Sequence, residues 1–292
     1  MRAPISGERI THHDLFAAPG SSRAATCCRL MKLAILTELE YELPNTTDVL
    51  LQVEAAMIPE QPVEHAHIDL PPAEHFARLP GHDEIGDRIW LRLQGTLNVR
   101  YEGRVSVERI TSDVGTLPKV PPHMLPAETI EYLMPSRYCA SDEFQSLVDA
   151  DFGKLDGGER IMAMRDWIES NIRYAPGSST SATDALQTYV SRCGVCRDFA
   201  HLLICMARAS TIPARFASVY GLGVEPQDFH AVAEVFLDDA WHLVDATGMS
   251  KSENMAKIGV GRDAADVSFL TSYGEAHMKN QSIQVSAVSA SD

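Results

Sequence analysis

The sequence predicts an α+β fold in which a β-rich, sandwich-like N-terminal part precedes a part where helices come before strands. Short apolar alternations separated by turn residues run from residue 31 to residue 116, which is typical of a small β-sandwich or barrel. A helical spacing of apolar residues follows, and it gives way to alternation again after Pro213. These two changes of pattern separate an all-β region from a mixed one.

The composition is that of a globular protein with a sizeable core. The chain has 292 residues, enough for two domains, and 45% of them are hydrophobic. Acidic residues outnumber basic ones by 40 to 25, and the net charge of -15 argues against nucleic acid or an anionic membrane as partner. No run of about 18 apolar residues occurs, so we expect no membrane-spanning segment.

The cysteines and the N-terminus favour a cytoplasmic protein. Six cysteines in a chain of this size do not form the pattern of a disulfide scaffold, so we expect reduced thiols. The N-terminus lacks the apolar stretch of a secretory signal. Residues 1–30 predict a flexible tail, and Met31, which opens a strand, is a candidate translation start. The histidines and vicinal cysteines of the N-terminal half show no tight ligand pattern, so we expect neither a metal nor a cofactor: His12, His13, Cys27, Cys28, His65, His67, His75 and His82.

Within the β-rich domain, residues 31–116, four strands are expected. Turns at Pro44-Asn45 and Glu102-Gly103 separate neighbouring strands, and Gly95 is a break within one of them. The strands are expected over residues 32–43, 49–57, 89–101 and 105–110. Residues 117–135 carry five prolines and predict a semi-rigid linker between the domains.

The second domain, residues 136–288, begins with helices and ends with strands. Helices are expected over 141–152, 158–174, 183–190 and from residue 196 to about residue 210. Strands are expected over 214–220, 230–237, 241–245 and 283–288, with an ordered loop over 259–267.

Cys196 is the first candidate for chemistry because it stands where an apolar helix begins. Phe199, Leu202, Leu203 and Met206 follow the spacing of one helical face. Unpaired N–H groups and the positive end of the helix dipole both favour a thiolate at that position. The thiolate is the nucleophilic form of cysteine.

A cysteine nucleophile needs a base, and the base needs a residue that orients it. His230 opens one expected strand and Asp245 ends the next. If the turn between them contains two residues, Asp238-Asp239, antiparallel pairing puts Asp245 opposite Val232. His230 and Asp245 then share a face as diagonal neighbours, whereas a three-residue turn would separate them.

Four blocks of this sequence together resemble bacterial transglutaminase-like cysteine peptidases, and they occur in the order of that family. The likeness extends upstream to Ile172-Arg173-Tyr174 and Thr183-Asp184-Ala185-Leu186, and downstream through residues 261–267. The β-rich N-terminal domain resembles, diffusely, the region often fused to such domains. The four blocks are Gly194-Val195-Cys196-Arg197-Asp198-Phe199-Ala200-His201, Ile212-Pro213-Ala214-Arg215, Asp228-Phe229-His230-Ala231 and Val244-Asp245-Ala246-Thr247.

The resemblance implies a papain-like core of helices packed on an antiparallel sheet, with Cys196 as nucleophile, His230 as base and Asp245 as the residue that orients His230. It implies acyl transfer from an amide of a protein or peptide substrate through a thioester. Water as acceptor gives a peptidase or amidase, which we favour because water is always present, and an amine gives a transglutaminase. A binding or scaffold module that retains an idle triad is a further alternative.

Several further features of the expected site follow from its neighbouring residues. The backbone N–H of Cys196 is the natural first oxyanion donor, and Tyr174, Tyr189 and Trp167 are candidates for the second. Many relatives carry tryptophan where this chain has Val232, so we expect a less aromatic pocket beside the base. Cys193 either forms a reversible disulfide with Cys196 or fills a small space. His201 lies off the Cys196 face of the helix and is expected to be buried. Substrate choice is expected from the first domain and from loops around Gly177, Gly223 and Arg262.

Overall fold

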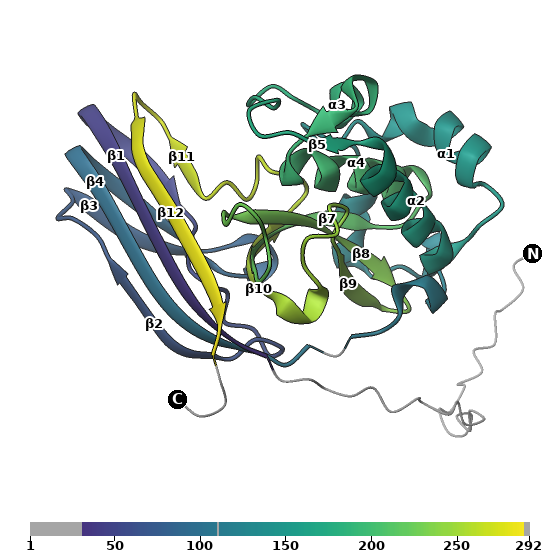
Figure 1. Cartoon of the computed structure of the whole chain (residues 1–292), viewed down its shortest axis with the longest axis horizontal. Coiled ribbons are helices and arrows are strands. Elements are labelled where there is room, and N and C mark those ends of the chain that lie inside the picture. Colours follow the sequence, from purple (N-terminus) through teal and green to yellow (C-terminus); the bar gives the residue numbers. More distant parts are fainter. Residues whose placement is uncertain (1–30, 110, 289–292) are drawn as a thin grey trace, which may run out of the picture.

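A computed structural model gives the structure of residues 31–109 and 111–288. The expected tail, with its histidine and cysteine pairs, lies outside these described residues. A sheet of long strands stands beside a part that contains helices α1–α4 (Figure 1).

Two long strands organise the N-terminal sheet. β1 (Met31–Leu51) and β4 (Asp87–Val107) pair antiparallel along nearly their whole length. The register shifts between Leu43 and Thr47, and Gly95 lies opposite Leu43. Four shorter strands complete the six-stranded sheet, one at each end of the two long strands: β2 (Val63–Asp69), β3 (His75–Pro80), β11 (Leu270–Ser272) and β12 (His277–Ala287).

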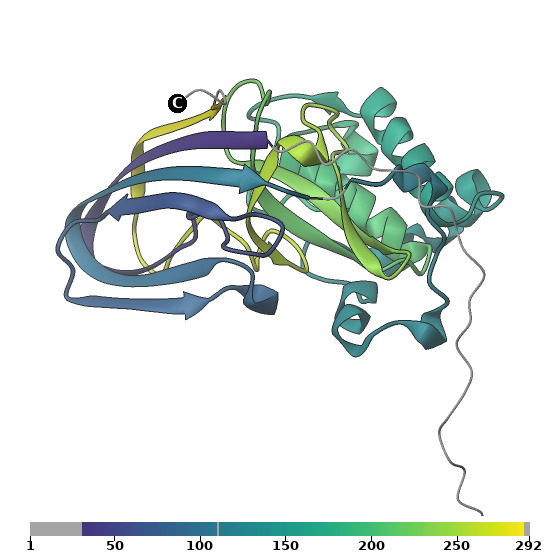
Figure 2. The ribbon, with the colours of Figure 1, turned by 90° about the horizontal axis from the view of Figure 1, so that it is seen from below.

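The sheet bends back on itself into two layers, so the expected sandwich-like architecture is confirmed (Figure 2). The apolar residues of β1 and β4 that face inward form one buried cluster between the layers. The expected turn at Pro44-Asn45 and the break at Gly95 are the bend inside continuous strands, because the long partner strand carries the pairing past them. The expected turn at Glu102-Gly103 is wrong, since both residues pair with β1 in mid-strand.

Strands β2 and β3 lie in a region that we expected to be loops. Their side chains are exposed or only half-buried. A strand with no buried face has no apolar alternation, and alternation is the signal from which a strand is predicted. His65, His67 and His75 therefore belong to strands rather than to loops.

The last two strands return to the N-terminal sheet. β12 pairs with residues Leu33 to Glu42 of β1, and β11 pairs with residues Val49 to Leu51. The expected strand over 283–288 exists, but its pairing partner is in the first domain. The structure thus differs from a division at residue 135, because residues 270–287 complete the sheet that residue 31 begins.

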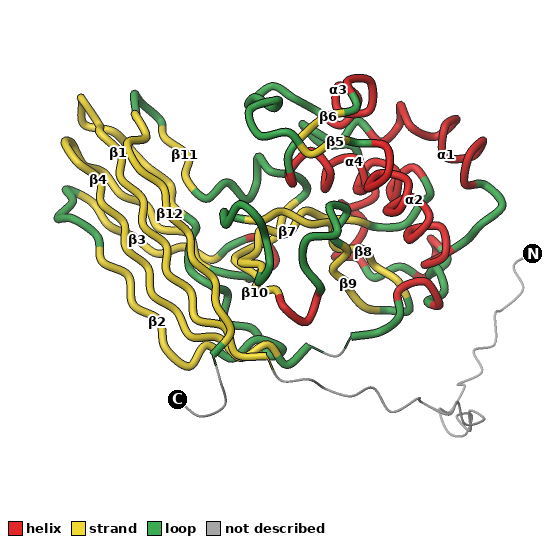
Figure 3. The backbone as a smooth tube through the Cα atoms, viewed as in Figure 1, coloured by secondary structure: helices red, strands yellow, loops and turns green. Residues whose placement is uncertain are grey.

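The second part contains a four-stranded antiparallel sheet with the order β10-β7-β8-β9. Helix α4 (Cys196–Ala209) packs on one face of this sheet, and helices α1–α3 gather around it on the side away from the six-stranded sheet (Figure 3). The remaining elements are α1 (Gln145–Phe152), α2 (Gly157–Asn171), α3 (Ala185–Ser191), β5 (Arg173–Tyr174), β6 (Cys193–Gly194), β7 (Ala214–Gly221), β8 (His230–Leu237), β9 (Ala240–Val244) and β10 (Met255–Gly261).

Strand β10 corrects the expectation of an ordered loop from residue 259. All seven of its residues are buried, so no apolar alternation marks it.

The proline-rich segment, residues 117–135, contains short 3-10 turns over 122–124 and 127–133, and another turn over 114–116 precedes it. Hydrogen bonds join the segment to the second part of the fold. For example, the Asp238 N–H donates to the Pro118 carbonyl (3.1 Å). In the ranges that the structure describes, no helix is long and apolar enough to cross a membrane.

Candidate functional site

Cys196 is the first residue of α4, and the turn before it is built around a buried carboxylate. Asp198 is fully buried and accepts a hydrogen bond from the Val195 N–H (2.8 Å). It also accepts one from the Ser179 hydroxyl (2.9 Å). A Cβ added to Gly194 would lie 2.7 Å from the Cβ of Asp198, so only glycine fits beside this carboxylate. The Gly-x-Cys spacing therefore follows from the way the helix begins.

His230 and Asp245 are brought together by the two-residue turn that we expected. β8 and β9 pair from Leu237 with Ala240 to Ala233 with Val244, and this register places Asp245 opposite Val232. Asp238 and Asp239 have φ values of 48° and 59°, and positive φ at both positions is what a type I′ hairpin turn requires. The His230 Nε2 donates to Asp245 Oδ2 at 3.0 Å.

Four donors surround the Asp245 carboxylate. Oδ1 accepts from the Thr247 N–H (2.8 Å) and the Thr247 hydroxyl (2.7 Å), and Oδ2 accepts from the Ser250 N–H (3.0 Å) in addition to His230. Burial by itself would raise the pKa of Asp245, but the bonds from His230, Thr247 and Ser250 lower it. The carboxylate therefore stays ionised, and the Asp-x-Thr spacing supplies two of its donors.

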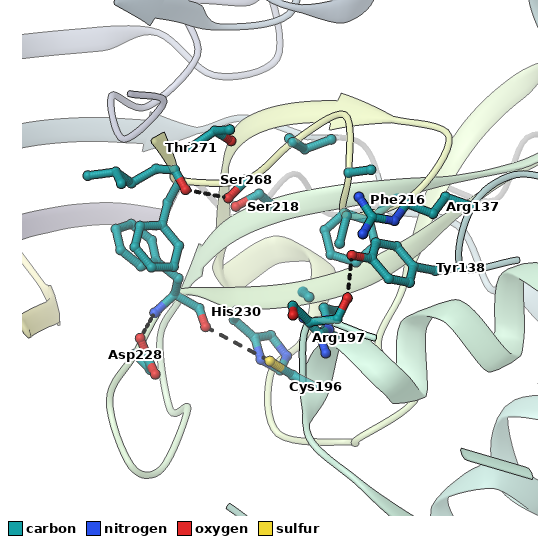
Figure 4. Close-up of a pocket in the computed structure, with 18 of the residues that line it drawn as sticks. Arg137, Tyr138, Cys196, Arg197, Phe216, Ser218, Asp228, His230, Ser268 and Thr271 are labelled. Carbon is teal, nitrogen blue, oxygen red and sulfur yellow. Dashed lines mark hydrogen bonds between the residues drawn. The ribbon is translucent and has the colours of Figure 1, made fainter. Parts of the chain in front are cut away.

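The Cys196 thiol lies next to the His230 ring (Figure 4). Cys196 is a hydrogen-bonding neighbour of the His230 ring, and its thiol also donates to the Phe229 carbonyl (3.9 Å) (Figure 4). Burial by itself would lower the pKa of His230, but Asp245 and Cys196 raise it to about 9. The ring is thus positively charged at neutral pH, next to the sulfur.

Of the three aromatic residues expected near the thiol, Tyr174 is the one that contacts it. Its hydroxyl is a hydrogen-bonding neighbour of both the backbone N–H and the thiol of Cys196. Burial, followed by the proximity of Cys196, raises the pKa of Tyr174 to about 12, so the phenol keeps its proton. Trp167 and Tyr189 instead stack on each other at 5.7 Å, and the Arg192 guanidinium covers both rings.

Cys196 and His230 open onto a pocket of about 470 Å³. Phe216, Phe229 and Phe269 line it, so the pocket is aromatic although Val232 replaces the tryptophan of many relatives. Phe229 stacks on Phe269 with ring centroids 4.6 Å apart. The other lining residues are Arg137, Tyr138, Ser181, Arg197, Ser218, Asp228, Ala231, Ala264, Ala265, Val267, Ser268, Leu270, Thr271 and Gln281.

Helix α4 also fixes the opposite wall of the pocket, which the sequence analysis did not anticipate. His201 is fully buried, as expected, and its Nε2 accepts from the Ala264 N–H (3.1 Å). Arg208 donates to the Arg262 carbonyl (2.6 Å). Asp263 accepts from the Tyr138 N–H (2.9 Å). Burial lowers the pKa of His201 well below its usual range, which keeps the ring neutral and able to accept.

Two other predictions concern cysteines and metals. Cys193 and Cys196 are both free thiols, and Cys196 but not Cys193 lines the pocket. Among the described residues, His82, Asp83 and Glu131 place their ligand atoms within 4.8 Å of one another. Asp83 Oδ2 already accepts from the Arg215 guanidinium at 2.6 Å, and a cation there disfavours a second one. We assign no ligand to this cluster.

The chain is similar to known proteins over both parts of the fold. The sequence model of the transglutaminase-like superfamily matches residues 148–246. A protein of Cytophaga hutchinsonii for which cysteine protease activity has been proposed has a crystal structure with 31% identity and a TM-score of 0.85, covering 90% of this chain and 93% of that chain. An uncharacterized protein of Mycobacterium leprae is 28% identical over 147 residues, 47% of this chain. The chain matches about half the length of that curated relative, 52%.

Proposed function

Because this chain belongs to the transglutaminase-like superfamily, we propose that it is a cysteine-dependent amide hydrolase, a peptidase or amidase, with Cys196, His230 and Asp245 as its triad. One observation carries the proposal. The His230 ring lies between the Asp245 carboxylate and the Cys196 sulfur at the mouth of a pocket. The relative from Cytophaga hutchinsonii supports protein or peptide substrates.

The first half of the reaction forms a thioester. The Cys196 thiolate attacks the carbonyl carbon of the substrate amide, and the electron pair of the C=O bond moves to oxygen. As the oxyanion collapses, the C–N bond breaks and the His230 imidazolium gives its proton to the leaving amine. The products of this half are a free amine, neutral His230 and an acyl group on the sulfur.

The second half returns the enzyme to its starting state. Neutral His230 takes a proton from water, and the hydroxide adds to the thioester carbonyl. The C–S bond then breaks, which releases a carboxylic acid and the thiolate. Asp245 keeps the charged ring in place during both halves, because its carboxylate accepts from Nε2.

The oxyanion is assigned two donors that neighbour each other beside Cys196. The backbone N–H of Cys196 is the first, and the Tyr174 hydroxyl, which neighbours that N–H, is the second. Because the pKa of the Tyr174 hydroxyl is about 12, the phenol keeps its proton at neutral pH and can donate a hydrogen bond.

The test is hydrolysis of a peptide library by the full chain and by Cys196→Ala. We expect cleavage by the wild type, no cleavage by Cys196→Ala, and retained cleavage by the nearby control Cys193→Ala. Cleavage by Cys196→Ala equal to that of the wild type would contradict the proposal. Transfer to an added amine in place of hydrolysis would identify a transamidase. A wild type that needs reductant for activity, with a Cys193→Ala variant that is active without reductant, would identify a thiol switch.

Alkylation separates an enzyme from a scaffold that retains an idle triad. Burial raises the pKa of the Cys205 thiol well above its usual range, which makes it a slow internal reference. Iodoacetamide should modify Cys196 ahead of Cys205, whereas equal, slow labelling of both would favour the scaffold. The free thiols of the described cysteines support the cytoplasm as the proposed compartment.

A further inference from the structure

The pocket at Cys196 differs in charge from the rest of the chain. The whole chain carries a net charge of -15. Arg137 and Arg197 both line the pocket, and Asp228 is the one acidic residue among the described residues that line it. The charge of the pocket is therefore opposite in sign to the net charge of the chain. A basic pocket of this kind attracts an anionic group.

Arg197 and Asp228 are already engaged with the protein. The Arg197 guanidinium donates to the Ser179 hydroxyl and the Thr180 carbonyl (2.6 and 2.5 Å). Asp228 accepts from the Phe229 N–H and from Gln281 (2.7 and 2.5 Å). These bonds hold both side chains in place against the protein, through one guanidinium nitrogen of Arg197 and through Oδ1 of Asp228.

Arg137 is the cation that remains available. Within residues 31–109 and 111–288, its guanidinium has no hydrogen bond or ion pair, and its only partner is the ring of Tyr138, whose centroid lies 4.9 Å from Cζ. The backbone next to Arg137 is held in place, because the N–H of Tyr138 donates to the buried Asp263. Figure 4 shows Arg137 and Asp228 on opposite sides of the pocket, with Cys196 between them.

Resting on the proposed function, we infer that the substrate carries a carboxylate that Arg137 binds while its scissile amide lies at Cys196. A guanidinium binds a carboxylate through two parallel hydrogen bonds, which fixes orientation as well as adding affinity. Phe216, Val267 and Phe269 line the same pocket and offer apolar contacts to the rest of the substrate. The carboxylate is either an acidic side chain or the C-terminus of a peptide, since both offer the same two oxygens.

Matched thiol-reactive probes test this inference without knowledge of the natural substrate. Three chloroacetyl compounds share one shape: glutamine α-amide is neutral, glutamic acid α-amide has a side-chain carboxylate, and glutamine with a free C-terminus has an α-carboxylate. The thiolate displaces chloride and forms a thioether, so mass spectrometry of the full chain gives the rate of Cys196 labelling. We expect the wild type to react about tenfold faster with one or both anionic probes than with the neutral one.

Variants assign that preference to Arg137. The ratio of the labelling rate with an anionic probe to that with the neutral probe should fall toward one in Arg137→Ala. Arg137→Lys should keep part of the preference, because lysine retains the positive charge but lacks the planar guanidinium that donates two parallel hydrogen bonds. Arg104→Ala, which removes an exposed arginine of β4 outside this pocket, is the matched control and should keep the wild-type ratio. His230 also attracts anions, and it is unchanged in all three variants.

The outcomes distinguish this inference from the proposed function. A wild-type ratio near one, or a ratio that survives Arg137→Ala, would overturn the carboxylate assignment whether or not the chain hydrolyses amides. The chain could instead show selective labelling that depends on Arg137 but hydrolyse no peptide of an acidic library. That result would contradict the proposed hydrolase activity and would still support the carboxylate site. The probe that reacts faster identifies the source of the carboxylate.

Discussion

The two nitrogens of the His230 ring have different surroundings. Nε2 bonds to Asp245 at 3.0 Å, whereas Nδ1 is buried and has no hydrogen-bond partner of normal geometry among the described residues. Cys196 is the side chain that contacts the ring beside Asp245. When the ring is protonated, the Nδ1 hydrogen is therefore available to the sulfur or to a leaving amine, and the Nε2 hydrogen is not.

Replacing Asp245 by asparagine should move the alkaline limit of activity. The imidazolium persists below its pKa of about 9, so hydrolysis should fall as pH rises through that value. Asp245→Asn removes the charge that helps to raise the pKa of His230, and the limit should shift to lower pH, with kcat about 100-fold lower. Peptide hydrolysis measured from pH 5 to pH 10 checks this. An unchanged alkaline limit would show that Asp245 does not tune the ring.

The same pKa shift makes folding depend on pH. The folded-state pKa of His230, about 9, lies above the usual value of 6.5 for an unfolded chain, so the protonated ring stabilises the folded state. This contribution is complete below pH 6.5 and is lost as pH rises through 9. The free energy of unfolding from urea titrations should decline in that window, by an amount on the order of 2 kcal/mol. His230→Gln should remove that part of the decline, and an identical profile in the variant would argue against this origin.

At the scale of elements, the sequence predicts the helices and strands that carry a regular apolar pattern and misses those that do not. Helix α4 begins at Cys196, where the helical spacing of apolar residues begins, and β7 and β8 occupy the expected ranges although all of their residues are buried. β2 has no buried face, and Lys257 and Gly259 interrupt the apolar residues of β10, so neither strand has a regular apolar pattern to detect. β1 was divided at its bend because Pro44-Asn45 is typical of a turn, and β4 was divided in mid-strand because Glu102-Gly103 is too.

Gly194→Ala should damage the element that presents the nucleophile. The added Cβ would lie 2.7 Å from Asp198 Cβ, both atoms being fixed by backbone, and relief of the clash would move the Asp198 carboxylate off the Val195 N–H. We expect a loss of about 1–3 kcal/mol in the free energy of unfolding and slower Cys196 alkylation. Gly115→Ala is the control, since its added Cβ meets nothing closer than 3.4 Å. Equal stability of the two variants would contradict this account of the Gly-x-Cys motif.

At the scale of the whole molecule, the sequence located the proposed triad but not the rest of its pocket. Cys196 begins α4, His230 begins β8 and Asp245 directly follows β9. Because the ends of these elements can be predicted, the residue types at them and their order along the chain indicated a triad. Arg137 follows a proline-rich segment, and residues 264–271 follow a strand that was missed. They reach the pocket through tertiary bonds from α4, such as His201 to Ala264, and no local pattern encodes such a contact. The return of β12 to β1 is likewise a long-range pairing.

One side chain connects the two sheets through their shared core. Tyr220 of β7 is fully buried, and its hydroxyl contacts the Thr37 hydroxyl (2.8 Å) of β1 and donates to the Val53 carbonyl (2.5 Å). Its ring also stacks against Tyr101 of β4, with centroids 6.2 Å apart. Together with β11 and β12, this contact predicts that the two sheets unfold as one cooperative unit.

Tyr220→Phe tests that prediction. The substitution keeps the ring but leaves the Val53 carbonyl and the Thr37 hydroxyl buried with one partner fewer, which should lower the free energy of unfolding by about 1–3 kcal/mol. Fluorescence and circular dichroism should still report coincident transitions at a lower denaturant midpoint. Tyr273→Phe, in which the residue replaced is 65% exposed, is the control and should change the midpoint little. Separate transitions for the two sheets, in the wild type or in Tyr220→Phe, would contradict a single cooperative unit, because a shared core cannot be lost from one sheet alone.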